Sequence, residues 1–203
     1  MKIDILIAGV GGQGQVLASR LIGAAAIAEG HFVRTGETIG MSQRGGCVMS
    51  HVRIGGESMS ATVPYGYADL IIGFELCETV RALKRLSPEG GLIVNTQVIK
   101  PVTVSLGREV YDTESMITAV KNTSKKLLML DGYKLAGNAG SVKAVNVVLL
   151  GAAVGSGFLP IGKESFISAI WGMIPQKYHE LNLKAFESGY EYSQDVKATV
   201  SQH

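Results

Sequence analysis

Short apolar runs alternate with longer segments of helical periodicity along most of the chain. Residues 2–9 form an apolar run that ends in glycine, which predicts a buried strand, and residues 13–29 place apolar side chains at helical spacing. The same alternation continues towards the C-terminus. It predicts further strands at 31–34, 48–54, 68–74, 92–95, 102–104 and 127–130, and helices at 75–86, 113–120 with Asp112 or Thr113 as cap, 141–154, 164–173 and 179–189.

Strands that alternate with helices are typical of the α/β class. We therefore expect a three-layer α/β/α arrangement, in which a largely parallel or mixed Rossmann-like sheet has helices on both faces. Two segments fit neither period: the polar, glycine-rich residues 35–46, and residues 87–91, which we expect to end a helix. No linker or repeat interrupts the pattern, so we predict one domain over residues 1–192, followed by a C-terminal tail over 193–203.

The composition excludes several classes of protein. Of the 203 residues 46% are hydrophobic, which is typical of a globular chain, and the formal net charge of +2 without a block of like charge gives no reason to expect nucleic acid as a partner. The longest apolar run contains Lys143 and Asn146 and is shorter than the roughly 20 residues of a membrane span. The sequence enters a strand pattern directly after Met1, so we expect a cytoplasmic protein without a membrane partner.

The glycine cluster that follows the first strand is the first candidate site. Gly9, Gly11, Gly12, Gln13 and Gly14 belong to a G-x-G-x-x-G sequence between a predicted strand and a predicted helix, where glycines and the helix N-terminus can receive a phosphate. The acid that would bind a ribose is missing, because Arg34 stands at the end of the second predicted strand. Two interpretations stay open: a phosphate site, and glycines that only allow the strand and the helix to pack closely.

The second candidate site lies within residues 37–53. Its first half is too rich in glycine and polar groups for a core, which favours contact with a ligand or a partner over a solvated loop. Arg44 adds a rigid set of donors that suits a carboxylate or a phosphate. The candidates that face substrate or partner are Glu37, Thr38, Gly40, Met41, Ser42, Gln43, Arg44, Gly45 and Gly46.

Together these two motifs resemble those of the gamma-type subunits of 2-oxoacid:ferredoxin oxidoreductases, and the run 40–46 is most similar to the beta subunit of the indolepyruvate enzyme. The similarity extends over nearly the whole chain. It includes Gly137-Asn138, the segment 146–151, and the segment 182–186 with Gly189.

The resemblance implies a hetero-oligomer that oxidises a 2-oxoacid with coenzyme A to an acyl-CoA and CO2 and passes the electrons to ferredoxin. It also implies that thiamine diphosphate and 4Fe-4S clusters lie on a larger partner subunit. This chain would bind no cofactor alone, and we expect no catalytic residue in it. It would close the partner's active site, with residues 11–14 available to coenzyme A, and Gln43 and Arg44 at the substrate or at the subunit boundary.

One stretch departs from the indolepyruvate pattern. Many such subunits carry a Ser-Pro-Leu-Ile-Pro-Glu-Gly sequence where this chain has residues 60–66, so a branched-chain or other 2-oxoacid remains an alternative substrate. Two alternative functions also remain, a stand-alone nucleotide-dependent dehydrogenase and a purely structural assembly module.

The histidines and cysteines predict no metal site. Cys47 and Cys77 are too few for an all-cysteine iron–sulfur or zinc site, which takes four, and we expect them to be small buried hydrophobes. His51, among apolar neighbours in a predicted strand, is expected to be a structural histidine.

Overall fold

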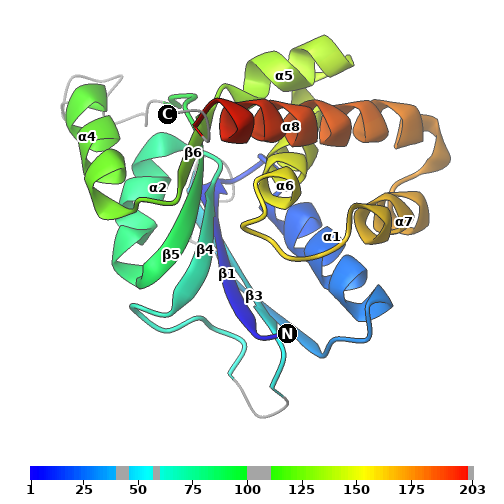
Figure 1. The fold of residues 1–203 in the computed structure, drawn as a ribbon, viewed down its shortest axis with the longest axis horizontal. Coiled ribbons are helices and arrows are strands. Elements are labelled where there is room, and N and C mark those ends of the chain that lie inside the picture. Colours follow the sequence, from blue (N-terminus) through cyan, green and yellow to red (C-terminus); the bar gives the residue numbers. More distant parts are fainter. Residues whose placement is uncertain (40–45, 57–59, 100–110, 201–203) are drawn as a thin grey trace.

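The computed structural model describes residues 1–39, 46–56, 60–99 and 111–200, and within them one mixed sheet runs through the centre of the chain (Figure 1). Its strands are β1 Ile3–Val10, β2 Val33–Ile39, β3 Cys47–Ile54, β4 Ala68–Gly73, β5 Leu86–Asn95 and β6 Leu127–Leu130. The predicted α/β class with helices on both faces is confirmed.

The strand order is β2-β3-β1-β4-β5-β6. From β1 to β6 the neighbours are parallel, whereas β3 runs antiparallel to both β1 and β2. The parallel half therefore directs the carboxyl ends of β1, β4, β5 and β6 towards one edge of the sheet. In open α/β sheets ligands bind beyond that edge.

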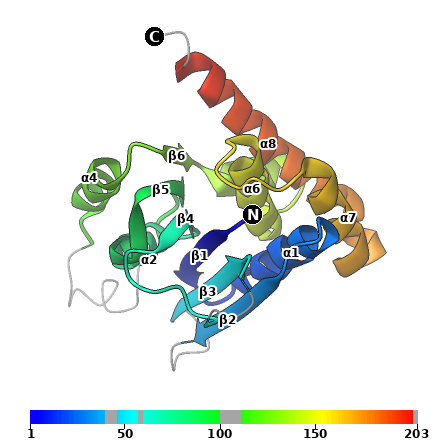
Figure 2. The same ribbon diagram turned by 60° about the horizontal axis from the view of Figure 1, so that its bottom comes forward.

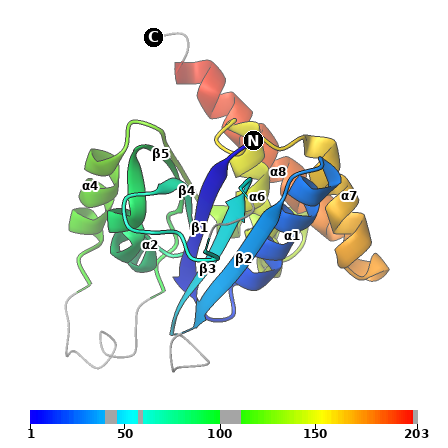
Figure 3. The same ribbon diagram turned by 90° about the horizontal axis from the view of Figure 1, so that it is seen from below.

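Helices cover the two faces of the sheet in unequal number (Figures 2 and 3). One face carries α1 Gln15–Ala28, α5 Gly132–Ala139, α6 Val145–Gly155, α7 Lys163–Met173 and α8 His179–Val200. The other carries α2 Leu76–Ala82 and α4 Thr113–Thr123. Short 3-10 turns lie at Leu83–Arg85, Val142–Ala144 and Gln176–Tyr178.

Strand β1 supplies side chains to both cores because alternate residues of a strand face opposite sides. Ile3, Ile5 and Ile7 pack in the larger core under α1 and α6, whereas Leu6 and Ala8 pack in the smaller core under α2 and α4. This explains the unbroken apolar run at the start of the chain, which is typical of a strand covered on both faces.

Helix α6 is buried nearly all round, and it lies between the sheet and α8 (Figure 1). Two glycines let α6 and α8 approach closely. A Cβ atom on Gly151 would overlap the carbonyl oxygen of Phe186, and one on Gly189 would overlap that of Val148. These glycines belong to the segments on which the family resemblance depends.

Three element predictions were wrong in extent, and one helix was missed. Strand β2 continues through residues 35–39, which pair with β3 although they are polar, and β5 already begins at Leu86, so residues 87–91 extend a strand. Helix α5 was missed, because only Asp131, which caps Lys134 N, marks it in sequence. Helix α8 continues to Val200, so residues 193–200 of the predicted C-terminal tail are helical. The predicted strand 102–104 lies outside the described residues.

Among the described residues, no helix is both long enough and apolar enough to cross a membrane.

Candidate functional site: a groove beside the glycine turn

The glycine turn links the carboxyl end of β1 to the first turn of α1. Gly12 and Gly14 have φ angles of 100° and 85°, in the left-handed region that side-chain-bearing residues rarely adopt. This local geometry needs glycine, and it places the N-terminus of α1 at the ligand-binding edge of the parallel strands.

Gln13 holds the turn in place from inside. Its Oε1 accepts a hydrogen bond from Val10 N at 2.9 Å, and its Nε2 donates to Phe74 O at 3.0 Å and to the Tyr133 hydroxyl at 3.2 Å. The side chain is buried, so it is occupied by the fold. The side chain of Gln13, one of the predicted phosphate-binding residues, is therefore not available to a ligand.

The N-terminus of α1 carries no side-chain cap. Its N-cap residue is Gly14, and the first turn contains no acidic residue within the described helix. No hydrogen bond between described residues uses the backbone N–H groups of Gly12, Gly14 or Leu17. Unpaired N–H groups together with the helix dipole make this end of α1 attractive to an anion.

Two adjoining cavities extend from this turn. The smaller, of about 340 Å³, lies against Gly12, Gly14, Tyr133 and Lys143. The larger, of about 620 Å³, continues between α1, α6 and the α7–α8 connection, and Leu17, Lys143 and Asn146 line both. We call the two cavities together the turn groove. It joins a polar end at the glycine turn to a more apolar end at Tyr178 and Leu181.

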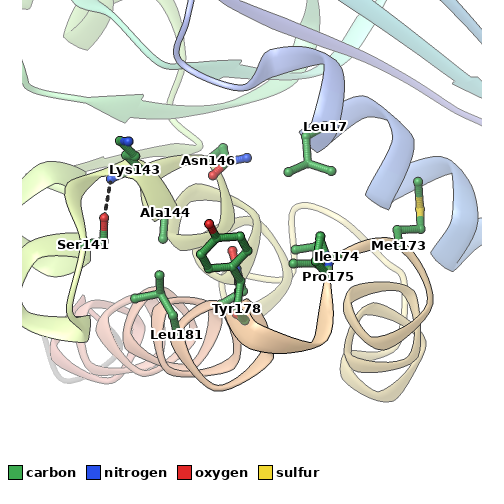
Figure 4. Close-up of a pocket in the computed structure, with 11 residues that line it drawn as sticks. Leu17, Ser141, Lys143, Ala144, Asn146, Met173, Ile174, Pro175, Tyr178 and Leu181 are labelled. Carbon is green, nitrogen blue, oxygen red and sulfur yellow. Dashed lines mark hydrogen bonds between the residues drawn. The ribbon is translucent and has the colours of Figure 1, made fainter.

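The close-up of the larger cavity shows Leu17 from α1 and Tyr178 from the α7–α8 connection pointing into the same space (Figure 4). The exposed Lys143 lies at the mouth of the turn groove. The backbone N of Lys143 donates a hydrogen bond to Ser141 Oγ at 3.3 Å. A lysine beside an uncapped helix N-terminus adds a second positive feature to the polar end of the turn groove.

The second predicted motif meets the first at its end. Gly46 O accepts a hydrogen bond from Gly11 N at 2.9 Å, and the next residue, Cys47, pairs with Val10. Glu37 and Thr38 lie exposed in β2, where Thr38 Oγ1 is 3.5 Å from His51 Nε2. The other candidates of this motif, Gly40, Met41, Ser42, Gln43, Arg44 and Gly45, lie outside the described residues.

The topology argues against a dinucleotide site of the Rossmann type. In that fold the strand after the first helix lies directly beside β1 and carries the ribose acid. Here β3 lies between β1 and β2, so β2 is two strand spacings, or roughly 10 Å, from β1. Arg34 pairs with Arg53 across β2 and β3 and is far along the sheet from the glycine turn.

His51 and Cys47 behave as structural groups. His51 is 1% exposed, its Nδ1 accepts a hydrogen bond from Val63 N at 3.1 Å, and burial together with Arg85 and Arg53 lowers its pKa to about 4. Burial first, and then the neighbouring Glu78 carboxylate, raises the pKa of Cys47 to about 12. Cys47 is therefore protonated at neutral pH and is no thiolate nucleophile.

Sequence reasoning missed several residues of the turn groove. Lys143, Tyr133 and Tyr178 come from three segments distant from the glycine turn, and no local pattern marks them. Asn146 also lines the turn groove, and its Nδ2 donates to Gly14 O at 3.4 Å, which holds the start of α6 against the glycine turn.

The fold and the turn groove define an α/β protein with a glycine turn and an open anion-attracting helix end, and the order of its described strands differs from that of a Rossmann dinucleotide site. Residues 4–192 match the model of the pyruvate ferredoxin/flavodoxin oxidoreductase family, and the chain belongs to that family.

Individual relatives agree with this assignment. An indolepyruvate oxidoreductase subunit, IorB, of Thermococcus kodakarensis is 37% identical over 197 residues, which cover 96% of this chain and 98% of the relative. The gamma subunit of a keto/oxoacid ferredoxin oxidoreductase from Geobacter sulfurreducens has a similar fold, with a TM-score of 0.70, 24% identity, and coverage of 95% of this chain and 99% of that chain.

A third likeness is to part of a larger chain. The 2-oxoglutarate:ferredoxin oxidoreductase from Magnetococcus marinus, solved with 2-oxoglutarate, coenzyme A and succinyl-CoA bound, gives a TM-score of 0.70 at 20% identity. The match covers 96% of this chain and 31% of that chain. At this level of identity the likeness shows a shared fold.

Proposed function

We propose that this chain is the cofactor-poor subunit of an indolepyruvate-type oxidoreductase and that its turn groove holds coenzyme A against the active site of a larger partner. The observation that supports the proposal is the continuity of the groove, from the uncapped end of α1 beside Lys143 to the apolar space at Tyr178 and Leu181. Coenzyme A has the matching order of groups, with phosphates at one end and a long, weakly polar arm at the other.

Within this site the residues have separate tasks. The backbone N–H groups of Gly12 and Gly14, together with Lys143, receive phosphate oxygens by charge-assisted hydrogen bonds. Leu17 and Tyr178 enclose the arm and exclude water from it. No described side chain is assigned a proton transfer, so the chemistry belongs to the assembled enzyme.

The reaction that we propose for the complex is oxidation of a 2-oxoacid with coenzyme A to an acyl-CoA and CO2, with two electrons passed to ferredoxin. Thiamine diphosphate, which supplies carbanion stabilisation when bound, and 4Fe-4S clusters are placed on the partner. The residues of this chain do not fit an all-cysteine cluster, because the sequence has 2 cysteines and such a cluster takes four.

The substrate class is proposed from two features of the sequence and its relatives. The 40–46 run has the indolepyruvate form, and a 37% identical relative is an indolepyruvate oxidoreductase subunit. Residues 60–66 depart from the usual pattern, and we propose a comparison of indolepyruvate with a branched-chain 2-oxoacid to decide the specificity. A cytoplasmic location is proposed with the complex.

The test is reconstitution of the complex from separately purified chains. The gene for the larger thiamine- and cluster-bearing subunit is co-expressed or mixed with this chain, and reduction of ferredoxin is followed with indolepyruvate and coenzyme A. We expect turnover only when both chains are present, because neither holds a complete site.

Two results would contradict the proposal. Full activity of the larger subunit alone would reduce this chain to an assembly module. Oxidation of a substrate by this chain alone with a nicotinamide cofactor would favour a stand-alone dehydrogenase.

A further inference from the structure

The two cysteines, distant in sequence, lie close to one another at the carboxyl edge of the parallel strands. Cys47 begins β3 opposite Val10, and Cys77 lies in the first turn of α2, which follows β4. Both are near the Glu78 carboxylate. The fold thus gathers thiols and carboxylates into one cluster outside the turn groove.

Three residues of this cluster present ligand atoms to one another. A carboxylate oxygen of Glu75, Sγ of Cys77 and a carboxylate oxygen of Glu78 all lie within 4.8 Å. Glu75 is held in place as the N-cap of α2, where its Oε2 accepts from Glu78 N at 2.9 Å, and its Oε1 accepts from the Tyr111 hydroxyl at 2.5 Å. The cluster is therefore anchored by the fold.

One carboxylate oxygen of the cluster has no hydrogen-bond partner among the described residues. Glu75 is 1% exposed and Glu78 is 4% exposed. Arg81 Nη1 donates to Glu78 Oε1 at 2.5 Å and the Cys47 thiol lies beside the same carboxylate, whereas Glu78 Oε2 is buried without a hydrogen-bond partner among the described residues. A buried carboxylate oxygen without a partner destabilises the fold. Such an atom beside a thiol indicates that a positive ligand belongs here.

We propose that Glu75, Cys77 and Glu78 bind a thiophilic divalent cation of the zinc type. The sulfur ligand favours such a cation over Mg²⁺ or Ca²⁺, which prefer oxygen ligands only. Zinc bonds of about 2.0–2.3 Å in a tetrahedron separate ligand atoms by roughly 3.5 Å, so a modest contraction of the cluster suffices. Three protein ligands leave the fourth position for water or for a group of the partner subunit.

This proposal departs from the sequence expectation of no metal site. That expectation considered cysteines and histidines only, and the carboxylates become ligands through the fold. The proposed site is independent of the coenzyme A groove, so failure of either proposal leaves the other standing.

The test is a titration of the metal-stripped full chain with Co²⁺, which reports a cobalt–thiolate bond by its charge-transfer absorption in the near ultraviolet. We expect the absorption to saturate at one cobalt per chain and to be displaced by Zn²⁺. Cys77→Ser should abolish it, and Glu78→Gln should weaken cobalt binding by at least about tenfold. Glu114→Gln, an exposed acid in the first turn of α4, is the matched control and should change nothing.

Circular dichroism establishes that each variant is folded. If Glu78→Gln does not fold, the cobalt absorption of Cys77→Ser alone tests the proposal. The proposal is overturned if excess Co²⁺ produces no thiolate absorption in the wild-type chain. It is equally overturned if Cys77→Ser keeps the absorption. The same holds if a folded Glu78→Gln binds cobalt as tightly as the wild type, or if the Glu114→Gln control weakens cobalt binding as much as Glu78→Gln does.

Discussion

The carboxamide of Asn146 lies directly against the α-carbon of Gly14. A Cβ atom on Gly14 would be 2.8 Å from Asn146 Nδ2, and the same nitrogen donates to Gly14 O at 3.4 Å. This contact joins the first turn of α1 to the start of α6 and fixes the polar end of the turn groove. The groove therefore depends on two elements that are far apart along the chain.

Replacement of Gly14 by alanine should cost more stability than replacement of Gly12. Both have positive φ angles, but a Cβ atom on Gly12 meets no atom within 4 Å, whereas one on Gly14 meets Asn146. We expect Gly12→Ala to lower the free energy of unfolding by about 1 kcal/mol and Gly14→Ala by about 2–3 kcal/mol. Urea denaturation measures both, and equal losses would show that the contact with Asn146 is unimportant.

Gln13 is predicted to stabilise the fold. Gln13→Met keeps a similar volume but removes the hydrogen bonds with Val10, Phe74 and Tyr133, and it leaves Val10 N buried without an acceptor. The expected loss is about 2–3 kcal/mol in the free energy of unfolding. Gln176→Met, at an exposed position, serves as the control in the same denaturation experiment. A loss no larger than that of the control would contradict the structural role of Gln13.

The buried ion pair between β1 and β3 should be essential to the fold. Arg53 donates through Nε and Nη2 to the two carboxylate oxygens of Asp4 at 2.7 and 2.9 Å. Asp4→Asn leaves the arginine without its counter-charge, and we expect a loss of about 3 kcal/mol. Glu180→Gln, which breaks the exposed pair with Lys184, should leave the denaturation midpoint unchanged. Similar midpoints for the two variants would contradict this expectation.

His51 should make the fold sensitive to mild acid. Its folded-state pKa of about 4 lies below the ordinary 6.5, so the unfolded chain binds the proton first. Protonation therefore favours unfolding, and stability falls as the pH decreases from 6.5 to 4. We expect His51→Asn to lose roughly 1–3 kcal/mol less than the wild type across that window. Parallel stability–pH curves for the two proteins would contradict the lowered pKa of His51.

The local parts of the fold could be predicted from the sequence. An unbroken apolar run predicted β1, and glycines after a strand predicted the turn before α1, because both signals reside in neighbouring residues. Strand β2 was predicted too short, since residues 35–39 are held by pairing with β3, and their own composition is that of a loop. Tertiary pairing overrides propensity in such an edge strand.

The site was predictable only on the side of the glycine turn. Lys143 and Tyr178 reach the turn groove through the packing of α6 and α8, which no local motif encodes. The meeting of Gly11 with Gly46 and the approach of Cys47 to Glu78 likewise follow from the strand order. A single sequence does not report such long-range neighbours.

The most direct test of the account is the Michaelis constant for coenzyme A in the reconstituted complex that carries Lys143→Met. Loss of one charge-assisted phosphate contact should raise this constant by about tenfold while the constant for the 2-oxoacid stays unchanged. Lys134→Met, an exposed lysine on α5 that does not line the turn groove, should behave as the wild type. An unchanged Michaelis constant for coenzyme A in Lys143→Met would contradict the account.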